Sequence, residues 1–150
     1  MGQSLANVLI HLVFSTKNRE PFITETIEPE LYRYMAEIFK QLNSPALIIG
    51  GTADHTHSLF TLSRTQTLAD VVEEVKKSSS KWIKTKGREF QTFQWQTGYG
   101  VFSIGQSNVA ALRSYIQKQK EHHRKVSFQD EYRLFLKKYG IVYDERYVWD

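Results

Sequence analysis

The sequence has 150 residues, with 20 Lys and Arg against 16 Asp and Glu, a formal net charge of +4 and a hydrophobic fraction of 41%. These values exclude a disordered chain and predict one folded domain over residues 1–150. The complete lack of Cys excludes disulfide bonds, thiolate zinc sites and cysteine nucleophiles. Every apolar stretch is far shorter than the roughly 20 residues that span a bilayer, and the N-terminus lacks a secretory pattern, so we expect a cytoplasmic protein without membrane contact.

The first half of the chain alternates between segments typical of strands and segments typical of helices. Val, Leu, Ile and Phe dominate residues 6–14, which indicates a strand. Residues 24–42 repeat apolar side chains at helical spacing until Pro45 ends the pattern. A second helical pattern begins at Thr67 and continues toward Ile83. The expected strands of this half are 6–14, 46–49 and 57–62, and the expected helices are 24–42 and 67–83.

The second half resumes regular structure after a Gly-Tyr-Gly turn, with an expected strand over 101–104. We expect Ser107 to cap a helix over about 107–123 and a C-terminal extension, about 127–150, to contain an amphipathic segment over 128–139. Strand, helix, strand, strand, helix, strand is the split βαβ pattern of a ferredoxin-like sandwich. The predicted fold class is α+β, an antiparallel sheet with helices on one face plus C-terminal helices. The extension either closes a dimer or covers the sheet, and both remain open.

Basic residues are concentrated in two segments. Residues 76–88 contain six basic side chains and no acidic one, and residues 113–125 contain five basic side chains and one Glu. The acids gather in other parts of the chain. Such clusters on a nearly balanced sequence indicate a surface for a polyanion, above all nucleic acid. Two solvated helix faces would produce the same pattern.

Two histidines separated by one residue are the first candidate metal ligands. On an extended strand His55 and His57 project to the same side, as two ligands of one metal ion require. Asp54 precedes them, and the turn at Gly50-Gly51 places the pair at the start of a strand. A chance polar pair at a strand edge is the alternative. Leu59 stands where a third His would be required, which excludes the histidine-triad hydrolases.

A polar stripe on the expected helix over 107–123 is the second candidate site. Tyr115, Gln119 and His122 follow one another at spacings of four and three residues, so they share one helix face. A tyrosine hydroxyl beside an amide oxygen that binds a metal can act as a nucleophile. In the alternative interpretation, Tyr115 packs its ring against the core.

Aromatic and amide side chains are interleaved between residues 90 and 102, next to the first basic segment. This composition suits stacking against unpaired bases. The alternative, which we favour for most of these residues, is that Phe93, Trp95 and Phe102 belong to the core and only Tyr99 is exposed.

Three segments together resemble the single-tyrosine HUH transposases, which are the small single-strand transposases of insertion sequences and their repeat-associated relatives. The segments are Asp-His-Thr-His at 54–57, Trp-Gln-Thr-Gly-Tyr-Gly-Val-Phe-Ser-Ile at 95–104 and Tyr-Ile-Gln-Lys-Gln-Lys-Glu-His-His at 115–123, in this order. The resemblance extends from the first strand almost to the C-terminus. Thr56 departs from the family, in which the residue between the two His is usually hydrophobic. We expect it to point away from the metal.

The resemblance implies an active site and its cofactor. His55 and His57 would bind a divalent cation, Gln119 would be the third ligand and Tyr115 the nucleophile, with His122 beside the site. The implied cation is Mg²⁺, for which Mn²⁺ can substitute. Because two imidazoles and an amide form a neutral ligand set, we expect weak metal binding until a DNA phosphate adds an oxygen ligand.

The resemblance also implies a substrate and an assembly. Such transposases cleave and rejoin single-stranded DNA near hairpins through a 5′-phosphotyrosine, need no ATP, and act as homodimers in which the Tyr helix docks on its own or on the partner's His pair. The residues expected to contact DNA are Lys76, Lys77, Lys81, Lys84, Lys86, Arg88, Tyr99 and Lys118. Two other functions stay open: a non-catalytic single-stranded nucleic-acid-binding module of the same fold, and a phosphodiesterase that hydrolyses the strand instead of transferring it.

Overall fold

The structure is a computed structural model that describes residues 2–150, so Met1 of the predicted domain lies outside the described residues. Its elements are β1 Leu9–Ser15, η1 Lys17–Arg19, α1 Glu28–Gln41, β2 Ala46–Gly51, β3 His55–Thr61, α2 Leu68–Lys84, η2 Arg88–Phe90, β4 Gly100–Ile104, η3 Gln106–Asn108, α3 Val109–Gln117, α4 Gln119–His122 and α5 Phe128–Lys138. Among residues 2–150, no helix combines the length and the apolar character needed to cross a membrane.

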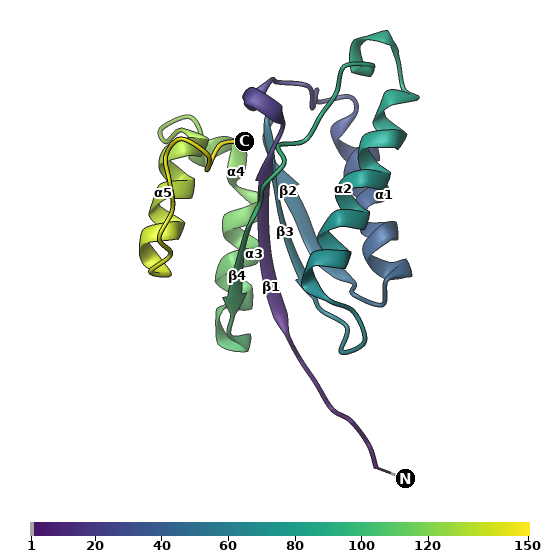
Figure 1. Ribbon diagram of the computed structural model, residues 1–150, viewed down its shortest axis with the longest axis vertical. Coiled ribbons are helices and arrows are strands. Elements are labelled where there is room, and N and C mark those ends of the chain that lie inside the picture. Colours follow the sequence, from purple (N-terminus) through teal and green to yellow (C-terminus); the bar gives the residue numbers. More distant parts are fainter. Residues whose placement is uncertain (1) are drawn as a thin grey trace.

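One antiparallel sheet, in the order β2-β3-β1-β4, forms the centre of the molecule (Figure 1). β1 pairs with both β3 and β4, and β3 also pairs with β2, so β1 and β3 are the inner strands. α1 connects β1 to β2, and α2 connects β3 to β4. This arrangement is that of the ferredoxin-like sandwich, and the predicted α+β fold class is confirmed.

The two faces of the sheet carry different helices (Figure 1). α1 and α2 cover one face, whereas α3, α4 and α5 lie on the other. Residues of β1 alternate between the faces: Leu12 and Phe14 pack in the α1 and α2 layer, while Val13 packs against α5 and the His11 ring contacts Phe135 of α5. The C-terminal extension therefore covers the sheet, which is one of the two roles that the sequence left open.

Hydrophobic side chains fill the layer between the sheet and helices α1 and α2. Met35 and Phe39 of α1 are fully buried, and the Phe39 ring packs 4.8 Å from that of Phe60 on β3. Burial of each such side chain stabilises the fold by about 1.5–3 kcal/mol. α2 begins where the sequence predicts, because the Thr67 hydroxyl accepts a hydrogen bond from the amide of Asp70.

The aromatic residues between 90 and 102 belong mainly to the core, as the favoured interpretation states. Phe93 and Trp95 meet edge to face at 4.8 Å, and the Trp95 indole donates a hydrogen bond to Ser79. Phe102 is buried on the opposite face, and Tyr99 is 37% exposed.

The expected helix over 107–123 is wrong in two respects. Ser107 does not cap it: residues 106–108 form a 3₁₀ turn, closed by the amide of Asn108 donating to the Gly105 carbonyl, and α3 begins after Asn108 without a side-chain cap. The helix also breaks at Lys118, whose φ of −99° and ψ of 18° are not helical. The break separates α3 from α4, and the Gln119 side chain that follows is directed into the molecule and is 1% exposed.

Aromatic packing holds α5 on the sheet. Phe128, Tyr132 and Leu136 of α5 are buried together with Val13 and Phe102 of the sheet. The final segment of the chain returns along α5, and its last residue accepts a hydrogen bond from the backbone just before β4. α5 is thus fixed by side-chain packing, without any strand pairing.

Candidate active site

The two candidate histidines lie next to each other at the start of β3. His57 is opposite Val13 of β1, His55 is opposite Ser15, and β2 pairs along the other edge of β3. Backbone hydrogen bonds on both sides therefore fix this strand. Both imidazoles are fully buried on the face of α3 to α5, with ring centroids 5.3 Å apart. Strand alternation directs Thr56, between them, to the opposite face.

α3 and α4 bring the tyrosine and the amide to this pair. Gly50 of β2 permits the close approach of α3, since a Cβ at this position would lie 2.7 Å from a backbone oxygen of that helix. The Tyr115 ring centroid is 5.9 Å from that of His57. Oε1 of Gln119 lies 3.0 Å from Nε2 of His55. One chain thus assembles all four residues that the resemblance selected.

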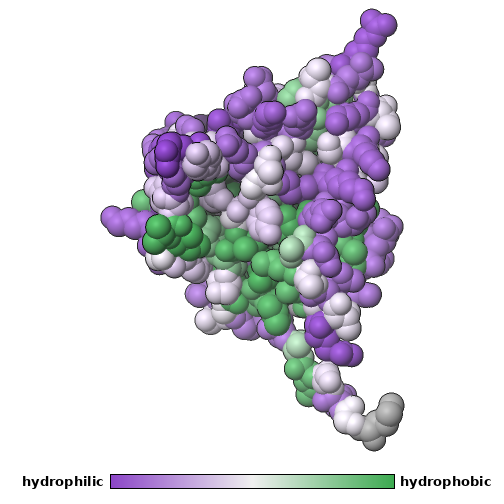
Figure 2. Space-filling model, viewed as in Figure 1, coloured by the Kyte–Doolittle hydropathy of each residue, from purple (hydrophilic) through white to green (hydrophobic). Residues whose placement is uncertain are grey.

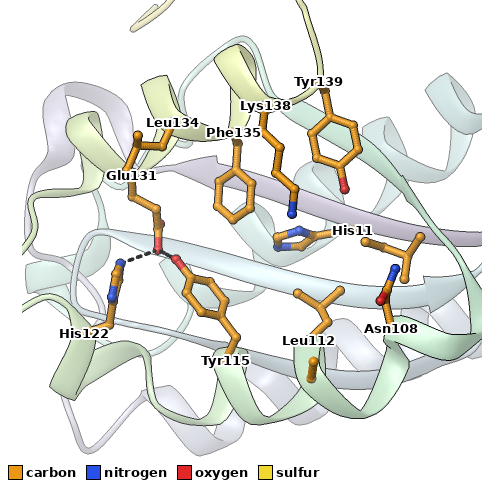
Figure 3. Close-up of a pocket in the computed structure, with 12 residues that line it drawn as sticks. His11, Asn108, Leu112, Tyr115, His122, Glu131, Leu134, Phe135, Lys138 and Tyr139 are labelled. Atoms are coloured by element: carbon orange, nitrogen blue, oxygen red, sulfur yellow. Dashed lines mark hydrogen bonds and ion pairs between the residues drawn. The ribbon is translucent and has the colours of Figure 1, made fainter.

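Glu131 of α5, which the sequence analysis did not select, lies at the centre of this group. Figure 3 shows its carboxylate between the Tyr115 hydroxyl and the His122 ring. Its Oε1 is 2.9 Å from Nε2 of His57. Its Oε2 accepts a hydrogen bond from the Tyr115 hydroxyl and another, at 3.1 Å, from Nε2 of Gln119. A single carboxylate therefore connects the candidate nucleophile with two candidate metal ligands.

The sequence does contain a signal for Glu131. In α5 the apolar residues Phe128, Tyr132 and Leu136 recur at helical spacing and form its buried stripe. Glu131 lies on the same stripe and is 2% exposed. Because a buried carboxylate is rare without polar partners, an acid on this stripe predicts a functional contact.

Two consecutive histidines complete the surroundings of this carboxylate. Nε2 of His122 and Nε2 of His123 lie 3.4 Å and 3.2 Å from Oε2 of Glu131. Nδ1 of His123 is 2.6 Å from the carbonyl of Val126, which can only accept, so this nitrogen carries the proton. Nε2 of His123 is buried and, among residues 2–150, has no partner apart from Glu131. His122, the residue expected beside the site, is half-buried there.

Burial and the shared carboxylate set the protonation states of the site. Burial by itself raises the pKa of Glu131, but hydrogen bonds from His123, His57 and Tyr115 outweigh it and hold this pKa far below 4.5. Burial and the Glu131 charge raise the pKa of Tyr115 well above that of a free phenol. Burial lowers the pKa of His57 despite Glu131, whereas Glu131 outweighs burial at His123 and raises its pKa. At neutral pH the carboxylate is charged and the Tyr115 hydroxyl is protonated.

The Nδ1 atoms of His55 and His57, which face away from Glu131, contact different partners. Nδ1 of His55 lies 2.7 Å from Oδ1 of Asp54 and 3.0 Å from the Thr52 hydroxyl. Nδ1 of His57 lies 2.8 Å from Nε2 of His11, a buried residue of β1. The sequence analysis did not select Thr52 or His11. Because His11 and His57 meet only through strand pairing, no local spacing reveals their contact.

The donor atoms of this group fit a divalent cation. Single ligand atoms of His55, His57, His123 and Glu131 all lie within 4.8 Å of one another. Nε2 of His55 and the amide oxygen of Gln119 converge at 3.0 Å, and each atom can donate a lone pair to a cation. Glu131 adds a negative oxygen to a ligand set that we expected to be neutral. Imidazole and carboxylate ligands together suit transition metals such as Mn²⁺, and the oxygens also suit Mg²⁺.

A cavity of about 490 Å³ opens beside the Tyr115 hydroxyl, between α3 and α5 (Figure 3). His11 lies at its base, Leu112 and Phe135 form apolar walls, and Lys138 reaches over it. Figure 2 shows hydrophobic side chains gathered on this side of the molecule. The site is therefore reached through an apolar recess with a cationic side chain at its edge.

The residues expected to contact DNA are divided among three places. Five of them are exposed on or just after α2: Lys77, Lys81, Lys84, Lys86 and Arg88. α2 lies across the sheet from α3, the helix that carries Tyr115 (Figure 1). Lys76 donates hydrogen bonds to three carbonyls of residues 96–98, and burial lowers its pKa to about 8. Lys118 is exposed at the junction of α3 and α4, close to Tyr115, and Tyr99 is exposed before β4. Of this set, Lys118 is the residue next to the candidate nucleophile, and Lys76 is engaged inside the chain.

A family model described as "Transposase IS200 like" matches residues 4–119. The chain belongs to the IS200-like transposase family. The matched segment includes His55, His57, Tyr115 and Gln119, and it ends before Glu131. The family thus accounts for the sheet and the Tyr helix, while the carboxylate at the centre of the site comes from the segment that follows.

Two solved structures share the fold of this IS200-like transposase. A protein from Deinococcus radiodurans R1, assigned as a transposase, is 19% identical with a TM-score of 0.63, over 79% of this chain and 96% of its own. A REP-associated tyrosine transposase bound to a REP hairpin is 14% identical with a TM-score of 0.56, over 83% of this chain and 74% of its own. No curated protein matches the sequence significantly.

Proposed function

We propose that this IS200-like transposase cleaves and rejoins single-stranded DNA near hairpins through a 5′-phosphotyrosine on Tyr115. The observation that carries the proposal is the carboxylate of Glu131, which binds the Tyr115 hydroxyl and Nε2 of His57 at once. This contact gathers a nucleophile, a charged proton acceptor and candidate metal ligands around one point. Family membership supports the class of activity, and the REP-hairpin complex of the structural neighbour supports hairpin DNA as the substrate.

The residues of the chain supply the steps of strand transfer. The Tyr115 oxygen attacks the phosphorus, so the bond from this oxygen to phosphorus forms while the bond from phosphorus to the 3′-oxygen breaks. Glu131 accepts the Tyr115 proton and passes it on to water, and the leaving 3′-oxygen takes a proton from water to become a hydroxyl. Attack by the 3′-hydroxyl of another strand reverses the step and restores Tyr115. The phosphotyrosine conserves the phosphodiester energy, which is why no ATP is required.

We assign a divalent cation, Mg²⁺ or its substitute Mn²⁺, to His55, His57 and Gln119, with Glu131 and His123 placed to join the ligand set. A bound cation would neutralise the charge that builds up on the phosphoryl oxygens. In the metal-free protein the raised pKa of Tyr115 keeps the nucleophile protonated. We therefore expect no strand cleavage in the presence of a chelator.

The cavity between α3 and α5 is the place we assign to the single strand next to the scissile phosphate. Its volume of about 490 Å³ falls within the usual range of sites for small ligands, so it can hold the sugar and base of one nucleotide. Lys138 at the edge of this cavity, and Lys118 in the neighbouring recess beside Tyr115, can pair with backbone phosphates. The affinity for single-stranded DNA should therefore fall steeply as the salt concentration rises.

A labelled-strand gel tests the phosphotyrosine directly. Single strands from palindromes that flank the gene are mixed with the protein and Mg²⁺ or Mn²⁺, and the products are separated under denaturing conditions. We expect a covalent protein–DNA band with the wild type and none with Tyr115→Phe, which keeps the ring and removes the hydroxyl. An adduct that persists in Tyr115→Phe assigns the nucleophile elsewhere.

The same gel separates the two other functions. A free 5′-phosphate end without any adduct at any time would indicate a hydrolytic phosphodiesterase. Binding of the same strands without a product under either metal would indicate a non-catalytic single-stranded nucleic-acid-binding module. Neither pattern is expected, because Tyr115 and the candidate ligands are assembled within one chain.

A homodimer belongs to the same proposal and has its own test. Tyr115 and Gln119 lie against the His pair of their own chain, which supports an active site built within a single subunit. Mixing Tyr115→Phe with His57→Ala asks whether two subunits can exchange these helices. Adduct formation by the mixture, with none by either variant alone, would show that an active site draws on both chains.

A further inference from the structure

His11 of β1 is a buried histidine that the proposed reaction does not use. It is 1% exposed, and its Nε2 lies 2.8 Å from Nδ1 of His57. The two rings are nearly parallel, with an angle of 22° and a centroid distance of 5.1 Å. Phe102 and Phe135 pack around the His11 ring, with their ring centroids 6.0 Å and 5.2 Å from its own, and this packing fixes the plane of the imidazole.

The corresponding contact behind His55 is chemically different. Its Nδ1 faces the carboxylate of Asp54, and a carboxylate only accepts hydrogen bonds. Nδ1 of His55 therefore keeps its proton whether or not Nε2 holds a metal. Behind His57 stands an imidazole, which donates from one nitrogen and accepts at the other.

Metal binding at Nε2 of His57 would require both ring nitrogens to exchange their roles as hydrogen-bond donor and acceptor. In the structure Nε2 of His57 faces the charged Oε1 of Glu131 at 2.9 Å, so with this contact the proton of a neutral His57 lies on Nε2. Nδ1 is then an acceptor, and Nε2 of His11 must donate to it. A metal-ligating Nε2 carries no proton, so the proton moves to Nδ1 and His11 has to accept it.

We propose that His11 is the positioning residue of His57: by donating to Nδ1 or accepting from it, His11 determines whether Nε2 of His57 is free to bind a divalent cation. The inference rests on the metal site of the proposed function. The change conserves protons, since each ring moves one proton from Nε2 to Nδ1. His11 lines the cavity beside Tyr115, which gives its ring a route for proton exchange with water.

Two substitutions separate this role from packing. His11→Gln retains a donor and an acceptor near the position of Nε2. His11→Met fills a similar volume among the same aromatic side chains, but it has no donor and only a weak acceptor. We expect Mn²⁺ binding, measured by calorimetry, to weaken by roughly 10- to 100-fold in His11→Met and to stay within about threefold of the wild type in His11→Gln. Thermal unfolding of both variants shows that each is folded.

Nitrogen NMR of the metal-free protein supplies a second readout that does not depend on activity. The sequence contains five His, so imidazole nitrogens in a histidine-labelled sample can be assigned by substitution. We expect the His57 proton on Nε2, with His11 also protonated on Nε2. A His57 that carries its proton on Nδ1 in this state, or a folded His11→Met that binds Mn²⁺ as tightly as the wild type, would overturn the role of His11.

Failure of the underlying function gives a different result. If the wild type binds no Mn²⁺ even at millimolar concentration with a single strand present, the metal site itself is wrong and the role of His11 is overturned with it. If the wild type binds Mn²⁺ but His11→Met and His11→Gln have the same Mn²⁺ affinity as each other, the metal site stands. Only the positioning role of His11 is then overturned.

Discussion

Two regions of the chain build the site in different ways. Residues 4–119, which match the family, supply His55 and His57 from an inner strand and Tyr115 from the helix that packs on it. The segment after residue 119 supplies Glu131 from α5, a helix held by an aromatic cluster. The first region is fixed by backbone hydrogen bonds on both edges of β3. The second is held mainly by side-chain packing, without strand pairing to the sheet.

Because of this difference, the position of α5 can change while the geometry of the sheet stays the same. The His pair cannot shift without breaking the sheet, so its geometry is a property of the fold. Glu131 sits on a helix whose position depends on the fit of Phe128, Tyr132 and Leu136 against the sheet, and such packing responds to single substitutions. The sheet therefore positions the chemistry, whereas α5 supplies the charge that holds Tyr115 and the imidazoles together.

Removing a ligand from the sheet should have the largest effect. We expect His57→Ala to reduce metal-dependent adduct formation by at least roughly 100-fold, because a ligand is lost and Glu131 loses a partner. His122→Ala is the matched control, since His122 is half-buried beside the same carboxylate and is not in the assigned ligand set. Quantified gels with each variant make the comparison. Equal losses in the two variants would contradict the assigned ligand set.

Removing the charge from α5 should give a smaller effect with a defined pH window. Because the folded pKa of Glu131 lies far below 4.5, its contribution to stability is complete above about pH 4.5 and is lost as the pH falls through the folded value. The pKa of His123 is raised above 6.5, so its contribution is complete below that pH and is lost as the pH rises through the folded value. Glu131→Gln removes both.

We therefore expect Glu131→Gln to lower the free energy of unfolding by roughly 2 kcal/mol near pH 5.5, with a smaller difference at pH 3 and at pH 8. Urea unfolding at the three pH values measures this difference. Asp130→Asn, on the exposed side of the same helix, controls for the loss of a carboxylate. A difference that does not change with pH would mean that Glu131 acts through packing and not through its charge.

Two sheet glycines test how closely each region must dock. An added Cβ at Gly50 would lie 2.7 Å from a backbone oxygen of α3, and one at Gly100 would lie 2.5 Å from the Tyr132 ring of α5. We expect each Ala variant to lose about 1–3 kcal/mol in the free energy of unfolding. The larger loss is expected at Gly50, because the contacted helix backbone cannot move away, whereas the Tyr132 ring can rotate. Gly105→Ala, which meets only side-chain atoms at 3.9 Å or more, is the control.

The gel for the protein–DNA adduct measures how the two glycine substitutions affect activity. Gly50→Ala should displace Tyr115 from the His pair and slow adduct formation by roughly tenfold, since small displacements at a reacting atom are costly. Gly100→Ala should act mainly on Mn²⁺ affinity, because it displaces Glu131. If both variants slow the adduct equally, the two regions do not have the separate roles described above.

The sequence predicted the first region well for a physical reason. Strand alternation and helical spacing are local, so they place His55 and His57 on one face and Tyr115 and Gln119 on another. The break at Lys118 and the 3₁₀ turn at 106–108 depend on backbone hydrogen bonds that residue spacing does not encode.

The second region could not be derived from such spacing. Glu131 meets its partners only after α5 has packed on the sheet, and its signal, an acid on a buried stripe, does not say which residues it will face. His11 reaches His57 across two paired strands, 46 positions apart in sequence. Contacts of this kind follow from the tertiary arrangement, and a search restricted to neighbouring positions overlooks them.

The smallest expected effect concerns the outer side of α5. Arg133 pairs with Glu145 at 2.7 Å and lies over the Trp149 ring at 5.0 Å, in contact with solvent. Exposed ion pairs of this kind contribute little because water and salt screen them. We expect Arg133→Met to leave the urea midpoint, Mn²⁺ affinity and adduct yield close to those of the wild type in 0.15 M salt. A marked loss of metal affinity in Arg133→Met would instead show that this surface contact, and not the buried aromatic cluster, holds Glu131 at the site.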